Sequence, residues 1–356
     1  MKTHLRIMTL SLSLATALAI APPALAEKTV KVFILAGQSN MEGKAKNSLL
    51  EFQATDPKTK DFFAHLRKGD AWIVRDDVFI KYLERKGGLT IGYGSPDSTG
   101  LELEFGTVMG NHFDEPVVLI KAAWGGHSLY KNFRPPSAGL PSEALLKAEL
   151  EKSQDNIRKQ NEKNKGKQAP LPTMEDIKAG YGTSYRNMMK EVKDTFDNYE
   201  TLFPLLKGKQ IELAGFVWFQ GFNDMFGDQA PGEYAANMEH FIKDVRKDLK
   251  VSKLPFVIGA LGQNGSKPAN GTMETIQNAQ LAMNEIPEFK GNVKTIRTDV
   301  LADKAAEALI EGWKNHFEEW KKVGSDHGYH YLGSAIWFTR IGHAMGGTMQ
   351  DLMTGK

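Results

Sequence analysis

Short apolar runs recur along the chain, and each of them ends at a glycine or a polar turn. Five runs are rich in β-branched residues and have the length of buried strands: residues 30–36, 116–123, 211–219, 255–261 and 293–298. Longer stretches with helical spacing of apolar residues lie between and after them: residues 101–113, 184–199, 233–249, 273–285 and 331–345. Strands that alternate with helices predict a three-layer α/β domain with a parallel sheet in the middle.

Two regions interrupt this alternation. Residues 44–98 mix charged residues with Gly and Pro, and residues 131–178 contain a polar run at 151–168 that is followed by Ala-Pro-Leu-Pro. We expect both regions to be surface insertions, and the polar run to be a solvated helix and loop. The length of the chain fits one large domain with insertions or two smaller domains.

The first residues have the pattern of a secretory signal peptide. Lys2, His4 and Arg6 precede an apolar run at residues 7–21, and Ala-Leu-Ala follows at 24–26. The run is shorter than the roughly 20 apolar residues that a membrane helix needs. We therefore expect cleavage after Ala26 and export to the periplasm or the medium.

Charge and cysteine content narrow the classes of partner. Without Lys2 and Arg6, 43 basic residues balance 43 acidic ones, so the exported chain is formally neutral. A neutral chain lacks the basic surface that nucleic acids and anionic membranes attract, and we expect neither as a partner. The chain has no cysteine, which excludes disulfides, a cysteine nucleophile and Cys-based metal sites. The sequence does not indicate an oligomeric state.

Polar clusters follow the first three predicted strands directly. They are Gly-Gln-Ser-Asn-Met at 37–41, Trp-Gly-Gly-His-Ser at 124–128 and Gln-Gly-Phe-Asn-Asp at 220–224. Ligands of an open parallel sheet bind beyond the carboxyl ends of its strands. Glycines there let backbone N–H groups approach a ligand, and Ser, Gln and Asn add a hydroxyl and amide donors. The clusters predict an oxyanion-binding site with Ser39 as its candidate nucleophile.

A serine nucleophile needs a base, and the C-terminal region offers one. Gly-Ser-Asp-His-Gly-Tyr-His-Tyr-Leu-Gly at 324–333 places Asp326, His327 and His330 just before the last predicted helix. A His that is oriented by a carboxylate commonly activates a serine hydroxyl. A loop in this position can bring the base over the end of the first strand, where Ser39 lies.

Other chemistries fit the sequence less well. A phosphate-binding loop needs four residues between its glycines, whereas Gly37 and Gly43 enclose five. A metal site on Asp326, His327 and His330 lacks a second ligand cluster, and the Gly-x-Ser-x-Gly elbow of α/β-hydrolases is absent. A non-catalytic polysaccharide-binding module on the same fold remains the main alternative that is not an enzyme. No cofactor or metal is implied.

The strand-end clusters, together with His-Tyr-Leu-Gly-Ser-Ala at 330–335, resemble the sequence blocks of SGNH hydrolases. The most similar branch comprises the carbohydrate esterases of family 6 and the sialate O-acetylesterases. The resemblance covers most of residues 29–347 outside the two insertions. It implies a single domain over residues 27–356, a flavodoxin-like α/β/α sandwich and the removal of acetyl groups from sugars. A general short-chain or lipolytic SGNH esterase is the second candidate.

The resemblance also implies roles for individual residues. Ser39 is the nucleophile, His330 the base and Asp326 the candidate acid. The oxyanion donors are the N–H groups of Ser39 and of a glycine in the Gly125–Gly126 turn, and the amide of Asn223. Candidate substrate contacts are Gln38, Gln220, Trp124 and His127.

The chain departs from the family pattern at three positions. The acid of the family usually stands three residues before the histidine, but here that position is His327 and Asp326 is one residue further away. Phe222 stands where many relatives have Glu, and Leu101 where they have Pro. The assignment of the acid and the details of substrate contact therefore depend on the structure.

Overall fold

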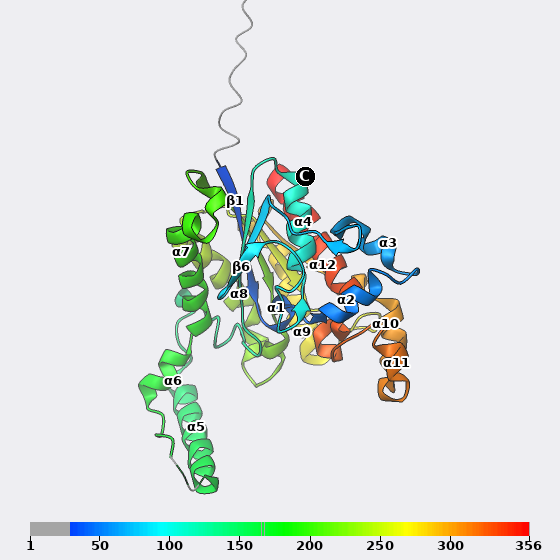
Figure 1. Ribbon diagram of the computed structural model, residues 1–356. Helices are drawn as coiled ribbons and strands as arrows, with labels where there is room; N and C mark the ends of the chain where they lie inside the picture. Colours follow the sequence, from blue (N-terminus) through cyan, green and yellow to red (C-terminus); the bar gives the residue numbers. More distant parts are fainter. Residues whose placement is uncertain (1–28, 165, 167, 356) are drawn as a thin grey trace, which may run out of the picture.

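A seven-stranded sheet forms the centre of the protein (Figure 1). The computed structural model describes residues 29–164, 166 and 168–355, so the expected signal peptide lies outside the described residues. The strand order is β11-β10-β9-β1-β8-β5-β6, and all neighbouring pairs are parallel except β5 and β6. The bounds of these strands are β1 Thr29–Gly37, β5 Val78–Tyr82, β6 Arg85–Gly88, β8 Val117–Ala123, β9 Gln210–Phe219, β10 Phe256–Ala260 and β11 Val293–Arg297.

The five strands expected from the sequence are confirmed as β1, β8, β9, β10 and β11. Taken in chain order they have the arrangement 2-1-3-4-5, which is the flavodoxin order. Gly37 at the end of β1 pairs with Ala123 of β8 and with Phe219 of β9. The three strands therefore end side by side at the point where the strand order reverses.

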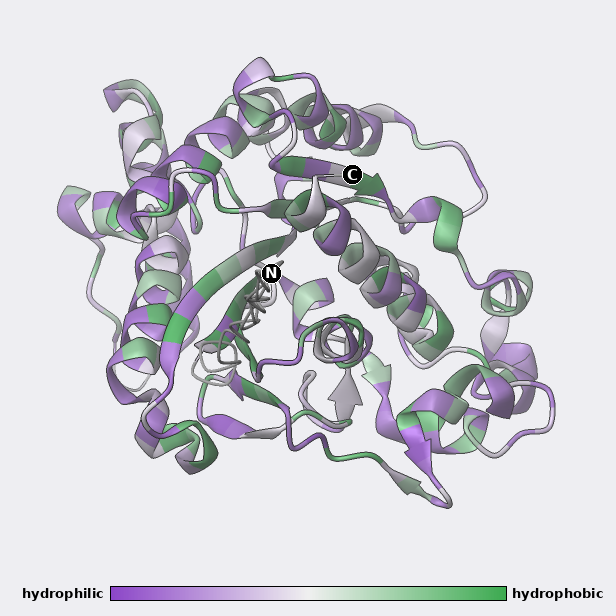
Figure 2. Cartoon of the chain, turned by 90° about the horizontal axis from the view of Figure 1, so that it is seen from above, coloured by the Kyte–Doolittle hydropathy of each residue, from purple (hydrophilic) through white to green (hydrophobic). Residues whose placement is uncertain are grey.

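Helices cover both faces of the sheet, as the alternating pattern predicts. In Figure 2, which looks down on the molecule from above Figure 1, helices lie on both sides of the strands. In β1, Phe33 and Leu35 pack on one face, and Val32, Ile34 and Ala36 pack on the other. The first face carries α4 (Glu102–His112) and α12 (Ala335–Thr354). The second carries α7 (Thr183–Leu202), α8 (Ala230–Asp248) and α9 (Gly271–Leu281).

The expectation that residues 44–98 form only a surface insertion is wrong. β5 and β6 lie within this region and extend the main sheet, with β5 parallel to β8. β5 has only five residues and stands between charged residues, so its apolar run is too short to stand out in the sequence. The same region also contains α2 (Asn47–Gln53), α3 (Lys60–Phe63) and the short strands β2 (Ala45–Lys46), β3 (Arg67–Lys68), β4 (Ala71–Trp72) and β7 (Ser98–Thr99).

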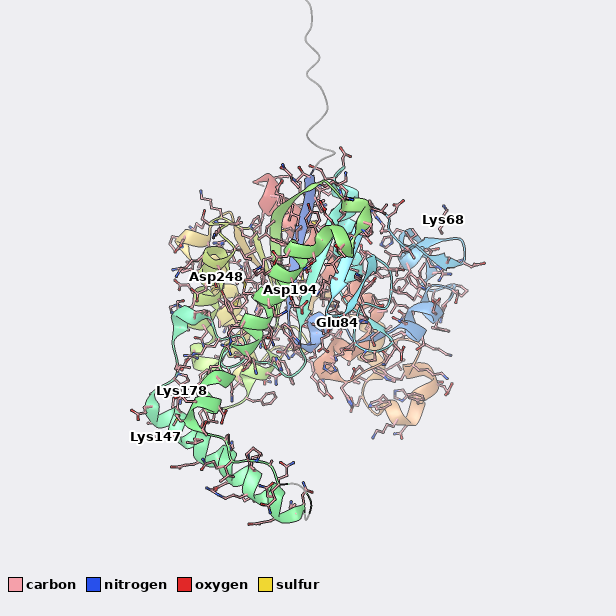
Figure 3. All side chains as sticks on the ribbon, turned by 60° about the vertical axis from the view of Figure 1, so that its left-hand side comes forward. Lys68, Glu84, Lys147, Lys178, Asp194 and Asp248 are labelled. Atoms are coloured by element: carbon pink, nitrogen blue, oxygen red, sulfur yellow. The ribbon has the colours of Figure 1, made fainter. Side chains whose placement is uncertain are left out.

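The second region, residues 131–178, begins in the core at the buried Phe133 and then leaves it. It contains α5 (Glu143–Lys163) and α6 (Met174–Gly180), and Leu146 is the only buried residue of α5. α5 and α6 reach away from the body of the protein, and Figure 3 labels Lys147 and Lys178 on them. Residues 151–163 of the polar run thus belong to a solvated helix. Among the helices in the described part of the chain, none has the length and apolar character to cross a membrane.

The last helix begins later than the sequence predicts. α12 starts at Ala335, where the Ser334 hydroxyl accepts a hydrogen bond from the Trp337 N–H. Tyr331 and Leu332 have left-handed backbone conformations, with φ of 53° and 62°, and cannot belong to a right-handed helix. The apolar spacing of residues 331–345 therefore continues across a turn, η10 (Gly328–Gly333), in which Tyr331 and Leu332 are buried in the core without being helical.

A buried ion pair between Lys121 and Glu102 lies close to the carboxyl end of β8. Lys121 lies in the otherwise apolar strand β8, and its side chain and that of Glu102 at the start of α4 are both 0% exposed. Lys121 Nζ donates to Glu102 Oε2 at 2.8 Å, to the Glu42 carbonyl at 2.7 Å and to the Tyr93 carbonyl at 2.8 Å. Burial lowers the pKa of Lys121, and the Glu102 carboxylate opposes this shift. The ammonium group thus joins four segments of the chain.

We expect Lys121→Met to lower the free energy of unfolding by about 3–5 kcal/mol, because it leaves the Glu102 carboxylate buried without its partner. Lys31→Met is the matched control, since Lys31 on β1 pairs with the half-exposed Glu212 and such a pair contributes about 1 kcal/mol or less. Urea unfolding of both variants measures the difference. Equal losses in the two variants would contradict a special role for Lys121.

Candidate active site

Ser39 stands at the reversal point of the sheet, directly after β1. It is the first residue of the short helix α1 (Ser39–Glu42) and is 7% exposed. The first N–H groups of a helix have no partner within the helix, so the Ser39 N–H is available to a ligand. Gly37 permits this turn, because a Cβ atom at that position would lie 2.1 Å from the Phe219 carbonyl oxygen.

The Gln38 side chain connects the ends of β1 and β9. Gln38 Oε1 accepts hydrogen bonds from the Gly221 N–H at 3.2 Å and from Gln220 Nε2 at 3.1 Å. Gln38 Nε2 donates to Asn223 Oδ1 at 2.9 Å. Because Asn223 Oδ1 already accepts this hydrogen bond, Asn223 Nδ2 is the end of the amide that is left for a ligand.

Gln38 and Gln220 were expected to contact substrate, but the structure places them in the interior. Both are 1% exposed, and their amide groups are bonded within the protein. Gln220 Nε2 also donates to the His127 carbonyl at 3.0 Å and to Asp224 Oδ2 at 2.6 Å. The two glutamines therefore connect the segments after β1, β8 and β9 below the surface of the site.

Asp224 fixes the turn that follows β8. Its carboxylate is fully buried and accepts hydrogen bonds from the N–H groups of Leu129 at 2.8 Å and Tyr130 at 2.7 Å. Burial raises the pKa of Asp224 to about 6, although the bonds from Gln220, Tyr130 and Leu129 act in the opposite direction. Two of its partners, Leu129 and Tyr130, lie more than 90 residues away and the third, Gln220, lies four residues before it, so Asp224 joins its own segment to the turn after β8.

The two glycines after β8 differ in what their N–H groups do. The Gly125 N–H donates to Glu42 Oε1 at 2.6 Å. Glu42 in turn accepts from Lys44 Nζ at 2.8 Å and Ser95 Oγ at 3.0 Å. Burial acts to raise the pKa of Glu42, but these donors outweigh it and the pKa lies below its usual value. Gly126 has φ of 77°, and its N–H has no hydrogen-bond partner within the described residues.

The loop before α12 pairs His330 with Asp326. His330 Nδ1 lies 3.0 Å from Asp326 Oδ2, close enough for an ion pair although the ring nitrogen is not aligned for a hydrogen bond. The other carboxylate oxygen accepts from the His327 N–H at 2.7 Å. Burial acts to raise the pKa of Asp326, but His330 and the His327 N–H lower it below its usual value. The His327 ring is exposed and stacks on Tyr329. Of the two histidines, His330 is the one that a carboxylate orients.

The same loop is fastened to the segment of Ser39. Asn40 Nδ2 donates to the Tyr329 carbonyl at 3.1 Å, which joins the neighbour of Ser39 to the neighbour of His330. The buried Tyr331 hydroxyl accepts from the Gly262 N–H at 2.8 Å and lies 2.9 Å from Thr298 Oγ1. These bonds offset the strained left-handed backbone of the loop. Within the described residues no hydrogen bond joins Ser39 Oγ to the His330 ring, a contact that often forms only with substrate bound.

Aromatic rings surround these groups. Trp124 is half-buried and stacks on His127, with 6.4 Å between the ring centres, and His127 Nδ1 lies 2.6 Å from Ser184 Oγ. Burial lowers the pKa of His127. Phe222 faces Tyr329 with 5.7 Å between the ring centres. Trp124 and His127 thus form a partly exposed stack in the turn after β8.

Sequence reasoning missed Glu42, Asn40, Tyr329 and Lys121. Glu42 and Asn40 belong to the block that contains Ser39, but which group a side chain meets across the site has no signal in the chain. For Lys121 the sequence did contain a signal, because a single charged residue in an apolar strand requires a buried partner. Across the described residues, no group of three or more His, Cys, Asp or Glu residues is placed to hold a metal ion.

Three solved structures resemble the fold at low identity. A protein from Arabidopsis thaliana is 17% identical, with a TM-score of 0.44, and the match covers 77% of this chain and 88% of that one. A carbohydrate acetylesterase from Xanthomonas citri is 13% identical, with a TM-score of 0.46 and coverage of 91% and 57%. NanS is 12% identical, with a TM-score of 0.43 and coverage of 79% and 80%.

No curated protein sequence matches the chain. Residues 29–166 and 172–311 match the model of a protein family described as carbohydrate esterase, sialic acid-specific acetylesterase. The matched residues include the three strand-end clusters and end before the loop that carries Asp326 and His330. The match spans well over half of the chain, and the chain belongs to this family of carbohydrate acetylesterases.

Proposed function

We propose that this protein is an exported serine esterase that removes O-acetyl groups from carbohydrates of the acetylxylan or sialate type. Ser39 is the nucleophile, His330 the general base and Asp326 the acid that orients it. The observation that carries the proposal is the pairing of His330 with Asp326 on a loop that Asn40 binds beside Ser39. Export rests on the signal-peptide pattern of residues 1–26.

The reaction follows from these groups. Ser39 Oγ attacks the acetyl carbonyl carbon while His330 Nε2 accepts the hydroxyl proton. The Ser39 N–H, Asn223 Nδ2 and the Gly126 N–H stabilise the resulting oxyanion. His330 then gives its proton to the sugar oxygen, which leaves as an alcohol. A water molecule attacks the acetyl-serine in the same way, and acetate and free Ser39 result.

The remaining residues position these groups. Gln38 holds the Asn223 amide so that Nδ2 points away from the interior, and Asp224 holds the turn after β8. Of the expected glycine donors we assign the role to Gly126, because Glu42 already accepts the Gly125 N–H. Glu42 then acts as a positioning residue that sets the direction of the turn.

The surroundings of the nucleophile favour a small acyl group. A Cβ atom at Gly221 would lie 2.9 Å from Gln280 and 3.0 Å from Ile276, so side chains already crowd the backbone beside Asn223. Trp124 and Phe222 flank the same strand ends. An acetyl group fits such a site better than a long chain, which favours the acetylesterase over a lipolytic SGNH esterase.

Ser39→Ala is expected to abolish hydrolysis of p-nitrophenyl acetate without affecting the fold, because it removes one oxygen and no core volume. A fluorophosphonate probe should label Ser39 in the wild-type protein. Circular dichroism serves as the control for folding. Residual turnover in the purified variant, or a label on another residue, would rule out the mechanism and favour the binding-module alternative.

His330→Ala should cost far more activity than His327→Ala, because only the His330 ring contacts the Asp326 carboxylate. Asp326→Asn should have an intermediate effect, since the base then loses its orientation but not its nitrogen. Steady-state kinetics on p-nitrophenyl acetate compares the three variants. If the His327 variant is inactive and the His330 variant is active, His327 and not His330 is the general base.

Asn223→Ala is expected to lower kcat by a factor of roughly 100 to 1,000, as the loss of one oxyanion donor does elsewhere. KM should change little, because the bond strengthens only in the transition state. Met225→Ala, in the same turn, is the matched control. A fall of less than tenfold in kcat would restrict Asn223 to a structural role.

A further inference from the structure

A cavity of about 660 Å³ opens beside the loop that carries His330. One wall is the segment after β10, with Gln263, Asn264 and Lys267, and another is α10 (Lys304–Leu309). Gly328 and Leu332 of the His330 loop close the third side. The volume is within the range of about 300–1,000 Å³ that is typical of small-molecule sites.

Gln263, one of the residues that line the cavity, has an amide nitrogen without a partner among the described residues. Gln263 Oε1 accepts a hydrogen bond from the Gly262 N–H at 3.2 Å. Gln263 Nε2 is buried and has no partner within the described residues. Buried amide groups nearly always have partners, so a donor left over in a cavity wall points to an acceptor supplied by a ligand.

The cavity combines amide groups with balanced charge. Asn264 and Asn270 add amide groups to its lining, and the buried Trp337 contributes an apolar surface. Two lysines and two glutamates also line it, so their charges cancel. One such pair is internal, because Lys304 Nζ lies 3.1 Å from Glu307 Oε2. Amides and an apolar ring surface without net charge suit an uncharged, hydroxylated ring.

The position of the cavity relates it to the reaction. It begins at the carboxyl end of β10, the strand next to β9, and β9 carries Asn223 at its end. Gly328 belongs to the same turn as His330, and the Tyr329 carbonyl between them is bonded to Asn40. A ligand in this cavity therefore meets Gly328 and Leu332, which lie two positions before and after His330 in the chain.

We propose that this cavity is the subsite for the leaving alcohol of the esterase and that it takes an uncharged sugar ring, with Gln263 Nε2 donating to a ring or hydroxyl oxygen. The inference rests on the proposed function and adds the class of sugar. It assigns substrate recognition to residues 263–270 and 304–311.

A second cavity is the alternative candidate for the sugar subsite. It is lined by residues 324–327 of the same loop and by Trp313 and Phe317, and has a volume of about 400 Å³. Its aromatic rings could stack on a sugar. Within its lining, however, no side-chain amide is present, and no buried polar atom there lacks a partner.

The test compares esters with and without a sugar. Wild-type protein, Gln263→Leu, Gln263→Glu and Gln350→Leu are assayed on p-nitrophenyl acetate, on a monoacetylated methyl xyloside and on 9-O-acetyl-N-acetylneuraminic acid. Gln350→Leu is the matched control, because it makes the same change on α12, where the amide donates to the Val108 carbonyl. Phe317→Ala tests the second cavity.

We expect both Gln263 variants to lower kcat/KM on the acetylated xyloside about tenfold, the effect of one lost hydrogen bond. Their activity on p-nitrophenyl acetate should stay within twofold of the wild type, which also shows that they are folded. The wild type should prefer the uncharged xyloside over the anionic sialic acid ester.

Three results would overturn the subsite: unchanged kinetics of the Gln263 variants on the xyloside, a selective loss in Phe317→Ala, or a preference for the anionic ester. Activity on p-nitrophenyl acetate without activity on either sugar ester also overturns it, but leaves the serine mechanism intact. By contrast, the absence of any Ser39-dependent hydrolysis in the wild type refutes the proposed function itself.

Discussion

The parallel pairing of β1 between β8 and β9 is the constraint on which the site depends. Because Gly37 is in register with Ala123 and with Phe219, the three polar clusters emerge at the same level of one sheet edge. Ser39, Gly126 and Asn223 come from segments that are far apart in the chain, and only this register brings them together. A shift by one residue would reverse every side chain of β1 between the two helical layers, so the packing of both faces fixes the register.

Buried polar groups then set the positions of the reactive ones. Each of Lys121, Asp224 and Gln38 is almost fully buried, and each is satisfied by several partners on other segments. Such groups are costly to bury alone, so the arrangement that pairs them is strongly favoured over its alternatives. The free donors of the site are the ones that this network leaves unused, namely the Ser39 N–H, the Gly126 N–H and Asn223 Nδ2.

The loop of His330 is held in a different way. Its backbone is strained at Tyr331 and Leu332, and the bonds of Tyr331 to the loops after β10 and β11 hold it in place. His330 thus takes its position from the same sheet edge as Ser39, although the two residues are far apart in sequence. The cavity lined by Gly328 and Leu332 shares a wall with this loop.

The sequence by itself determined the five core strands, their helical layers and the polar clusters that follow the strands. These features depend on local periodicity and on turn residues, which are written in consecutive positions. It also placed Asp326 and His330 on one loop, since their spacing is local. The sequence did not predict the short strand β5, because five residues between charged ones give too weak an apolar pattern to identify a strand.

Only the tertiary structure decided which polar groups face a ligand. Gln38 and Asn223 are separated by 185 positions, and nothing in either segment indicates that their amides bind each other. For the same reason the sequence could not show that Gln220 is buried, that Glu42 accepts the Gly125 N–H, or that Gln263 has a donor to spare. A residue type fixes what a side chain can bind, but the packing of distant segments decides what it does bind.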